Sequence, residues 1–141
     1  MKTGTMMNSM KKFAFAAVAA VMFAAVVAHA TTVSECQAII AGLKTKTQAV
    51  AIAGRSAETK DRPGLIVKLD EANLKLDQAK FCDSIQKLND FKARVNQLAA
   101  AGRINQDPNA GTTAQELLAD ADAAIACVND LVTQSGTVCT F

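Results

Sequence analysis

The residues of this chain with the clearest chemical potential are its four cysteines. Thiolates can hold a metal ion, exchange electrons or pair as disulfides, and metal and redox sites use closely spaced thiols such as C-x-x-C. Here the gaps between successive cysteines are 46, 45 and 12 residues. An even number of widely spaced cysteines in a short chain is typical of a disulfide-bonded exported protein. We therefore expect structural disulfides, and no metal site, among Cys36, Cys82, Cys127 and Cys139.

Neighbouring carboxylates are the second candidates, because a pair of them can perform acid–base catalysis. The nearest pairs are Asp70 with Glu71 and Asp120 with Asp122. Both lie among Ala, Lys and Asn residues in stretches with helical periodicity, which favours a solvated helix face over a catalytic pair. Histidine, the most frequent general base, occurs only at His29, and no phosphate-binding or Ca²⁺-binding loop motif is present. We predict no catalytic residue, no cofactor and no enzymatic activity.

Residues 1–30 have the pattern of a secretory signal peptide. Lys11 and Lys12 precede the apolar run FAFAAVAAVMFAAVVA, and the segment ends at the A-x-A motif of residues 28–30. The run is about 16 residues long, shorter than the roughly 20 that a spanning helix needs, and no comparable run follows. We predict an exported protein, periplasmic or secreted, with a single domain over residues 31–141 and no membrane span.

Residues 31–141 contain 12 basic and 13 acidic residues and no His, Met, Trp or Tyr. This balance gives no electrostatic reason to expect a nucleic acid as a partner. Without Trp or Tyr, a carbohydrate site lacks the usual stacking side chains. Basic residues do gather around the first predicted loop, and this cluster predicts either a docking site for an acidic or glycan partner or a mixed, flexible loop. Its members are Lys44, Lys46, Arg55, Lys60 and Arg62, with Glu58 and Asp61 among them.

Apolar residues recur with a helical period in four segments, and no segment alternates with a period of two over enough residues for a strand. The first helix is expected over residues 33–53, after a capping box at Thr32 and Glu35. The fourth begins after a second capping box, at Thr113 and Glu116.

The second helix is expected to start near Arg62, with Asp61 as its N-cap. A weak break at residues 76–80 predicts a tight hairpin to a third helix over residues 81–101, with one continuous helix as the alternative. The third helix carries an apolar stripe that we interpret as one wall of a core, formed by Ile85, Leu88, Phe91, Val95 and Leu98.

Short loops between these helices predict an antiparallel four-helix bundle in which the chain runs alternately up and down. This topology places the start of the first helix, the start of the third and the end of the fourth at one pole, so the four cysteines gather there. Four cysteines allow three pairings, and spacing does not choose among them. We favour Cys36–Cys82 with Cys127–Cys139.

About residues 64–131 contain KLDEANLKLDQAKFCDSIQKLNDFKARVNQLAAAGRI, followed by TAQELLADADAAI. This part of the chain resembles the FIMAH-type helical domain of exported bacterial proteins. The resemblance implies an all-helical module, often attached to secreted enzymes or surface proteins, with no catalytic residues to transfer. The matching positions are Lys68, Leu69, Leu76, Leu88, Phe91, Val95, Gly102, Ile104, Ala114 and Leu117.

Many packing signals and no catalytic constellation lead to a prediction of function. We expect a monomeric exported interaction module that binds a protein or glycan partner. The alternatives are a carrier that holds an apolar small molecule between its helices and an inhibitor-like or toxin-like secreted factor. The polar stretch TKTQ at residues 45–48 predicts either a groove for a hydrophobic partner or a polar patch on an amphipathic helix.

Overall fold

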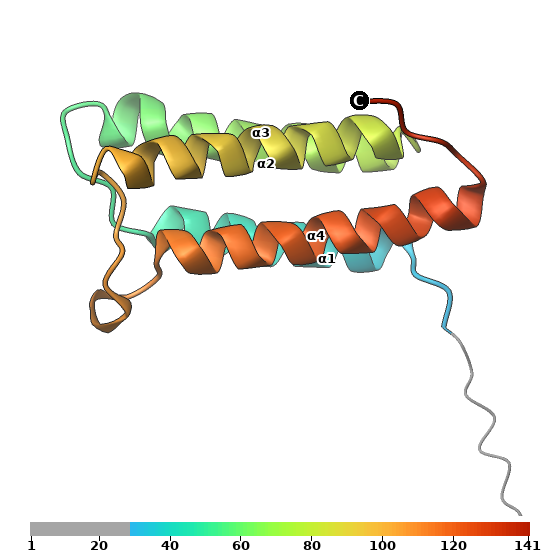
Figure 1. Cartoon of the computed structure of the whole chain (residues 1–141), viewed down its shortest axis with the longest axis horizontal. Helices are drawn as coiled ribbons and strands as arrows, with labels where there is room; N and C mark the ends of the chain where they lie inside the picture. The colour runs from blue at the N-terminus through green and yellow to red at the C-terminus, as the bar shows by residue number, and fades with distance from the viewer. Residues whose placement is uncertain (1–28) are drawn as a thin grey trace, which may run out of the picture.

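Four α-helices make up most of residues 29–141, the part of the chain that the computed structural model describes. Each helix packs against two neighbours, in the cyclic order α1, α2, α3, α4. Figure 1 shows them as two layers, with α2 and α3 above α1 and α4. The predicted all-α bundle is therefore confirmed, whereas the predicted signal peptide lies outside the described residues except for its last two. The helices are α1 (Val33–Ala49), α2 (Arg62–Asp77), α3 (Phe81–Ala100) and α4 (Ala114–Ser135).

Both predicted capping boxes are present. The Thr32 hydroxyl accepts the Glu35 N–H at 3.2 Å, and the Glu35 carboxylate accepts the Thr32 N–H at 2.7 Å. Thr113 and Glu116 make the same exchange, at 3.2 Å and 2.8 Å. Each box satisfies backbone donors that the first turn of a helix leaves without partners. Local sequence therefore sets where α1 and α4 begin.

The structure also confirms the predicted hairpin between α2 and α3, and not the alternative of one continuous helix. The backbone of Ala79 has a φ of 54°, a left-handed conformation that a helix interior does not tolerate. The Lys80 N–H then donates to the Lys75 carbonyl at 2.8 Å, which closes the turn. A three-residue connection of this kind fixes α2 and α3 as antiparallel neighbours.

The apolar stripe of α3 is one wall of the core, as predicted. All five of its members are buried, and Phe91 is fully so. Removing such side chains from water stabilises the fold by roughly 1.5–3 kcal/mol each. The opposing walls are formed by fully buried side chains of the other three helices, including Ile40, Leu65, Leu69, Leu117 and Val128.

Helix α1 ends at Ala49, earlier than the predicted position 53. The residues that follow α1 pair with the loop between α3 and α4 instead. The Ala53 N–H donates to the Arg103 carbonyl at 2.7 Å, and the Asn105 N–H donates to the Ala51 carbonyl at 2.9 Å. The guanidinium of Arg62 satisfies the last carbonyls of the helix, so no glycine is needed to cap it. Its Nη1 donates to the carbonyls of Thr47, Gln48 and Val50 at 2.8, 2.7 and 2.9 Å.

The favoured disulfide pairing is wrong. Cys36 is bonded to Cys127, and Cys82 is bonded to Cys139. In the cyclic order of the bundle α1 packs against α2 and α4, whereas α3 lies diagonally across, so Cys36 meets a cysteine of α4 and not one of α3. The tail after Ser135 leaves α4 and crosses to the other layer, where α3 begins (Figure 1). This crossing brings Cys139 to Cys82.

Candidate functional site

The outer seam between α2 and α3 carries a ladder of ion pairs. Each rung joins one residue of α2 to one of α3, and successive rungs are three or four residues apart on each helix. Side chains at this spacing share one face of a helix, so the rungs lie one above another along the hairpin. The rungs are Lys75–Asp83 at 3.5 Å, Glu71–Lys87 at 2.9 Å and Lys68–Asp90 at 3.8 Å.

The ladder is interrupted at Gly64. The register of the other rungs places Gly64 opposite Arg94, but glycine has no side chain to complete the pair. A Cβ built at Gly64 would meet no atom within 4 Å, so the space is open. A groove of about 340 Å³ lies there. It is lined by Lys60, Gly64, Lys68, Asp90, Ala93, Arg94 and Gln97.

The cations of this groove keep much of their capacity to bind an anion. Lys60 has no ion-pair partner among residues 29–141. The ammonium of Lys68 lies 3.7 Å from Glu71 and 3.8 Å from Asp90, both beyond hydrogen-bond distance. An anion placed between Lys60 and Lys68 would therefore gain hydrogen bonds that the free protein does not make.

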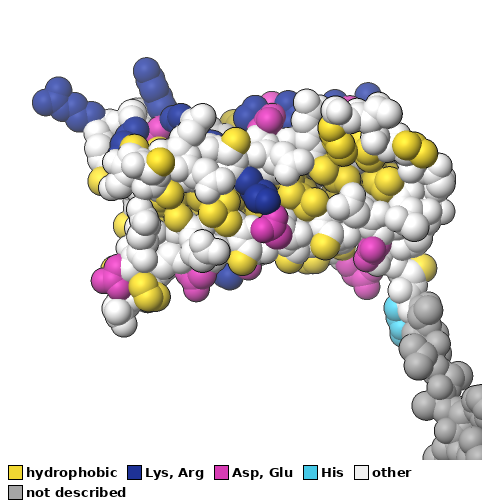
Figure 2. Space-filling view, viewed as in Figure 1, with side chains coloured by type: hydrophobic (Ala, Val, Ile, Leu, Met, Phe, Trp, Pro, Cys, Tyr) yellow, Lys and Arg dark blue, Asp and Glu magenta, His cyan; other side chains and the backbone are white. Residues whose placement is uncertain are grey.

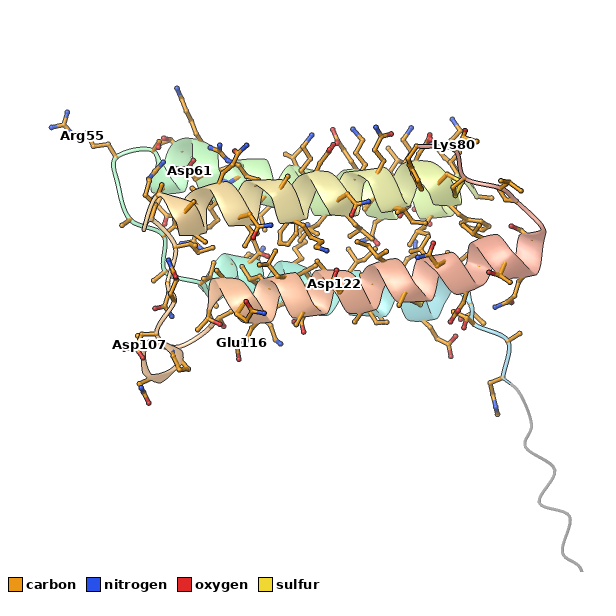
Figure 3. The ribbon with its side chains drawn as sticks, viewed as in Figure 1. Arg55, Asp61, Lys80, Asp107, Glu116 and Asp122 are labelled. Carbon is orange, nitrogen blue, oxygen red and sulfur yellow. A yellow bond between two sulfur atoms is a disulfide. The ribbon has the colours of Figure 1, made fainter. Side chains whose placement is uncertain are left out.

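Arg94 is held in place by a buried carboxylate beside the groove. Asp61 is only 1% exposed, and its two oxygens accept hydrogen bonds from the Ser56 hydroxyl at 2.8 Å, Arg94 Nη2 at 2.6 Å and Arg103 Nη2 at 2.5 Å. The Ser56 hydrogen bond, followed by the two guanidinium groups, lowers the pKa of Asp61 below its ordinary value despite burial. Figure 3 shows Asp61 near the end of the α2–α3 layer where the first loop lies. Asp61 thus stays ionised and orients Arg94.

The predicted role of Asp61 as the N-cap of α2 is wrong. Its backbone is already helical, with φ −74° and ψ −54°, and its side chain makes no capping hydrogen bond. A short π-helix over Ala57–Asp61 runs directly into α2, and within it the Asp61 N–H donates to the Ser56 carbonyl at 2.9 Å. The carboxylate is consequently free to turn inward towards Arg94 and Arg103.

The carboxylate pairs singled out in the sequence do not come together as acid–base pairs. Each carboxylate instead pairs with a lysine on a neighbouring helix, which is the solvated-face arrangement. Three of these ion pairs are Lys44–Asp70 at 2.6 Å, Lys46–Asp120 at 2.7 Å and Lys92–Asp122. The Glu71 carboxylate pairs with Lys87 across the α2–α3 seam, and this contact lowers the pKa of Glu71 and raises that of Lys87.

The basic cluster around the first loop is divided by the fold. Lys44 and Lys46 turn towards α2 and α4, where each has an acidic partner. Arg62 points back to the end of α1 and to Glu58, which lies 2.9 Å away. Arg55 projects outward from the loop, as Figure 3 shows. Of this cluster only Lys60 lines the groove.

The polar TKTQ stretch of α1 satisfies its hydroxyl groups within the helix. Thr47 is buried and donates to the Leu43 carbonyl at 2.8 Å, and Thr45 donates to the Ala41 carbonyl at 3.1 Å. Gln48 is exposed. These bonds match a polar patch on an amphipathic helix.

The two layers of the bundle carry opposite charge. Residues 54–103, which include α2 and α3, hold ten basic and seven acidic residues, whereas residues 31–53 and 104–141 hold two basic and six acidic ones. The net charges are thus +3 and −4. In Figure 2, dark blue side chains gather along the upper margin of the molecule, and most magenta ones lie lower.

The sequence predictions passed over Gly64 and Arg94, and Lys68 entered only through the family resemblance. A signal for the ladder was available, since Lys68, Glu71 and Lys75 share one face of α2. Their partners on α3 depend on the register of the hairpin, which periodicity alone does not supply.

No family model, curated protein or solved structure matches this chain. The resemblance to FIMAH-type domains therefore stays a prediction. Between residues 29 and 141, no helix is both long and apolar enough to cross a membrane, and no three His, Cys, Asp or Glu side chains gather so that they could hold a metal ion.

Proposed function

We propose that this protein is an exported, non-catalytic binding module that engages a protein partner through its basic α2–α3 layer. The observation that carries the proposal is the separation of charge between the layers, +3 against −4, in a chain whose charges nearly cancel. Such a separation orients an approaching partner and accelerates encounter, because opposite potentials attract over roughly 10 Å at 0.1 M salt.

Export is supported by the state of the cysteines as well as by the signal-like residues 1–30. All four cysteines are paired as disulfides, and no cysteine is free. Disulfides persist in oxidising compartments such as the periplasm or the extracellular medium. We expect the protein to act as a monomer there.

The alternative function, a carrier of an apolar ligand, draws less support from the packing. The space between the helices is occupied by side chains such as Phe91, Leu43 and Leu69, which are at most 1% exposed. A ligand held between helices would have to displace them. The groove at Gly64, in contrast, lies on the surface of the α2–α3 hairpin.

The test is cross-linking in the native cells with matched charge variants. One variant carries Lys60→Gln and Lys68→Gln on the α2–α3 layer. A control carries Lys44→Gln and Lys46→Gln, at the two basic residues of the other layer, so its net charge is the same. We expect one protein to be captured by the wild type and the control, and lost from the first variant. Equal capture by both variants, or no specific capture by the wild type, would contradict the proposal.

A further inference from the structure

We infer that the groove at Gly64 is a docking site for an acidic, aliphatic segment of a protein partner, with a carboxylate of that segment completing the interrupted ion-pair ladder. The inference rests on the proposed function and names the chemistry of the partner. Its first support is the open space at Gly64, where the ladder lacks a side chain. Glycine inside a helix is destabilising relative to alanine, and the open space at Gly64 shows that no packing constraint requires it.

The second support is the charge around the vacancy. Three cationic side chains, Lys60, Lys68 and Arg94, line the groove with one carboxylate, Asp90. Arg94 is already oriented by Asp61 at 2.6 Å, so little side-chain entropy remains to be lost when an anion binds. A carboxylate at this position would take the place that an acidic residue of α2 would occupy if the ladder continued.

The surroundings of the groove favour a protein segment over a polyanion. Val67 and Leu74 are 49% and 53% exposed, and they lie on α2 one turn and three turns after Gly64. Being seven residues apart, they occupy the same side of the helix, roughly 10 Å from each other. Aliphatic side chains of a peptide can cover them, whereas a sugar chain or a lipid headgroup gains nothing there.

The carboxylates of the ladder argue in the same direction. Glu71 and Asp83 alternate with lysines along the seam beyond the groove, and Asp90 lines the groove itself. An extended anionic surface, such as a membrane or a polyuronate, would meet these carboxylates and be repelled. A segment with a discrete carboxylate followed by aliphatic residues avoids them.

The absence of Trp and Tyr from the chain makes the test direct. A synthetic Glu- and Leu-rich peptide with a single Trp can be followed by its own fluorescence while the disulfide-bonded protein is added. We expect the peptide in which Gln replaces Glu to bind at least about tenfold more weakly. Binding of the Glu peptide should also weaken as salt rises, because the charges involved are exposed.

Two matched pairs of variants locate the binding. Gly64→Leu fills the groove, and Gly42→Leu is its control, because a Cβ at Gly42 also meets nothing within 4 Å and Gly42 lies in α1. Lys68→Gln removes a cation of the groove, and Lys92→Gln removes a similarly exposed one that pairs with Asp122. We expect Gly64→Leu and Lys68→Gln each to weaken peptide binding at least about fivefold and the controls to change it less than about twofold.

Three results would overturn the inference: no peptide binding by the wild type, equal effects in both members of each pair, or equal binding of polygalacturonate or anionic vesicles. Circular dichroism and thermal unfolding establish that each variant is folded, and the Gly→Leu variants are expected to be at least as stable as the wild type. If cells still yield a partner that Gly64→Leu captures normally, the groove is not the docking site although the protein remains a binding module. Failure of both experiments would reject the proposed function as well.

Discussion

The disulfide between Cys82 and Cys139 offers a quantitative test of how the fold is stabilised. The bond closes a loop of 57 residues. Cross-linking a loop of that length restricts the unfolded chain by about 4 kcal/mol in the chain-entropy account. In the folded state the tail contributes little, because Val138 and Phe141 are 83% and 80% exposed. Nearly all of the effect should therefore act through the unfolded state.

The perturbation is the double change Cys82→Ser with Cys139→Ser, with Cys36–Cys127 left intact. We expect the free energy of unfolding to fall by about 3–4 kcal/mol. The lower end of this range allows for the second disulfide, which already restricts the same unfolded chain. Urea unfolding followed by circular dichroism measures it, and full curves are needed because a less restricted unfolded chain also raises the m-value.

A truncation separates the two possible origins of the loss. Cys82→Ser in a chain ended after Gly136 removes the tail together with the bond, and we expect it to match the double-serine variant within about 0.5 kcal/mol. A loss below about 1 kcal/mol in the double-serine variant would refute the unfolded-state explanation. A truncation that costs much more than the double-serine change would show instead that the tail stabilises the folded state.

Three further predictions concern the core, the groove and the buried carboxylate. Phe91→Ala, at a fully buried position, should cost about 3–5 kcal/mol in urea unfolding, and a loss below about 1 kcal/mol would contradict its place in the core. Gly64→Ala should raise stability by about 0.5–1 kcal/mol, as should Gly42→Ala, and a loss at Gly64 alone would mean that its surroundings are not open. Since the pKa of Asp61 is lowered from 3.8, its folded form binds fewer protons than its unfolded form, and its contribution is present above about pH 4 and lost as the pH falls further. Asp61→Asn should therefore be less stable than the wild type at pH 7 by a margin that narrows below pH 4, and a constant margin across a pH series would exclude this linkage.

Features with local determinants were predictable from the sequence. The two capping boxes and the buried stripe of α3 depend on residues within a few positions of each other, and all of them are present. The end of α1 was not predictable from the sequence. It depends on Arg62 and on backbone pairing with residues 103–105, about 50 positions later in the chain. Helix beginnings marked by side-chain caps can thus be read more securely than ends that a distant loop determines.

The predicted disulfide pairing was wrong because the direction of each helix does not determine which helices are neighbours. Gathering the cysteines at one pole followed from the alternating directions of the helices, but pairing depends on which helices are neighbours. The cyclic order places α1 and α3 on a diagonal, so Cys36 and Cys82 do not meet although both lie near the start of their helices. Considering lateral neighbours as well as poles would have disfavoured that pair.

The groove shows where periodicity stops being informative. Lys68, Glu71 and Lys75 mark a charged face of α2, and Asp83, Lys87 and Asp90 mark one of α3, but each pattern alone reads as a solvated surface. Only the register of the hairpin makes them rungs of one ladder, and only then does Gly64 become a missing rung. The buried position of Asp61 could not be predicted from the local sequence either, because the two arginines that pair with its carboxylate lie 33 and 42 residues away. A sequence can thus display every member of such a site while the gap between them, the feature that a ligand would fill, exists only in three dimensions.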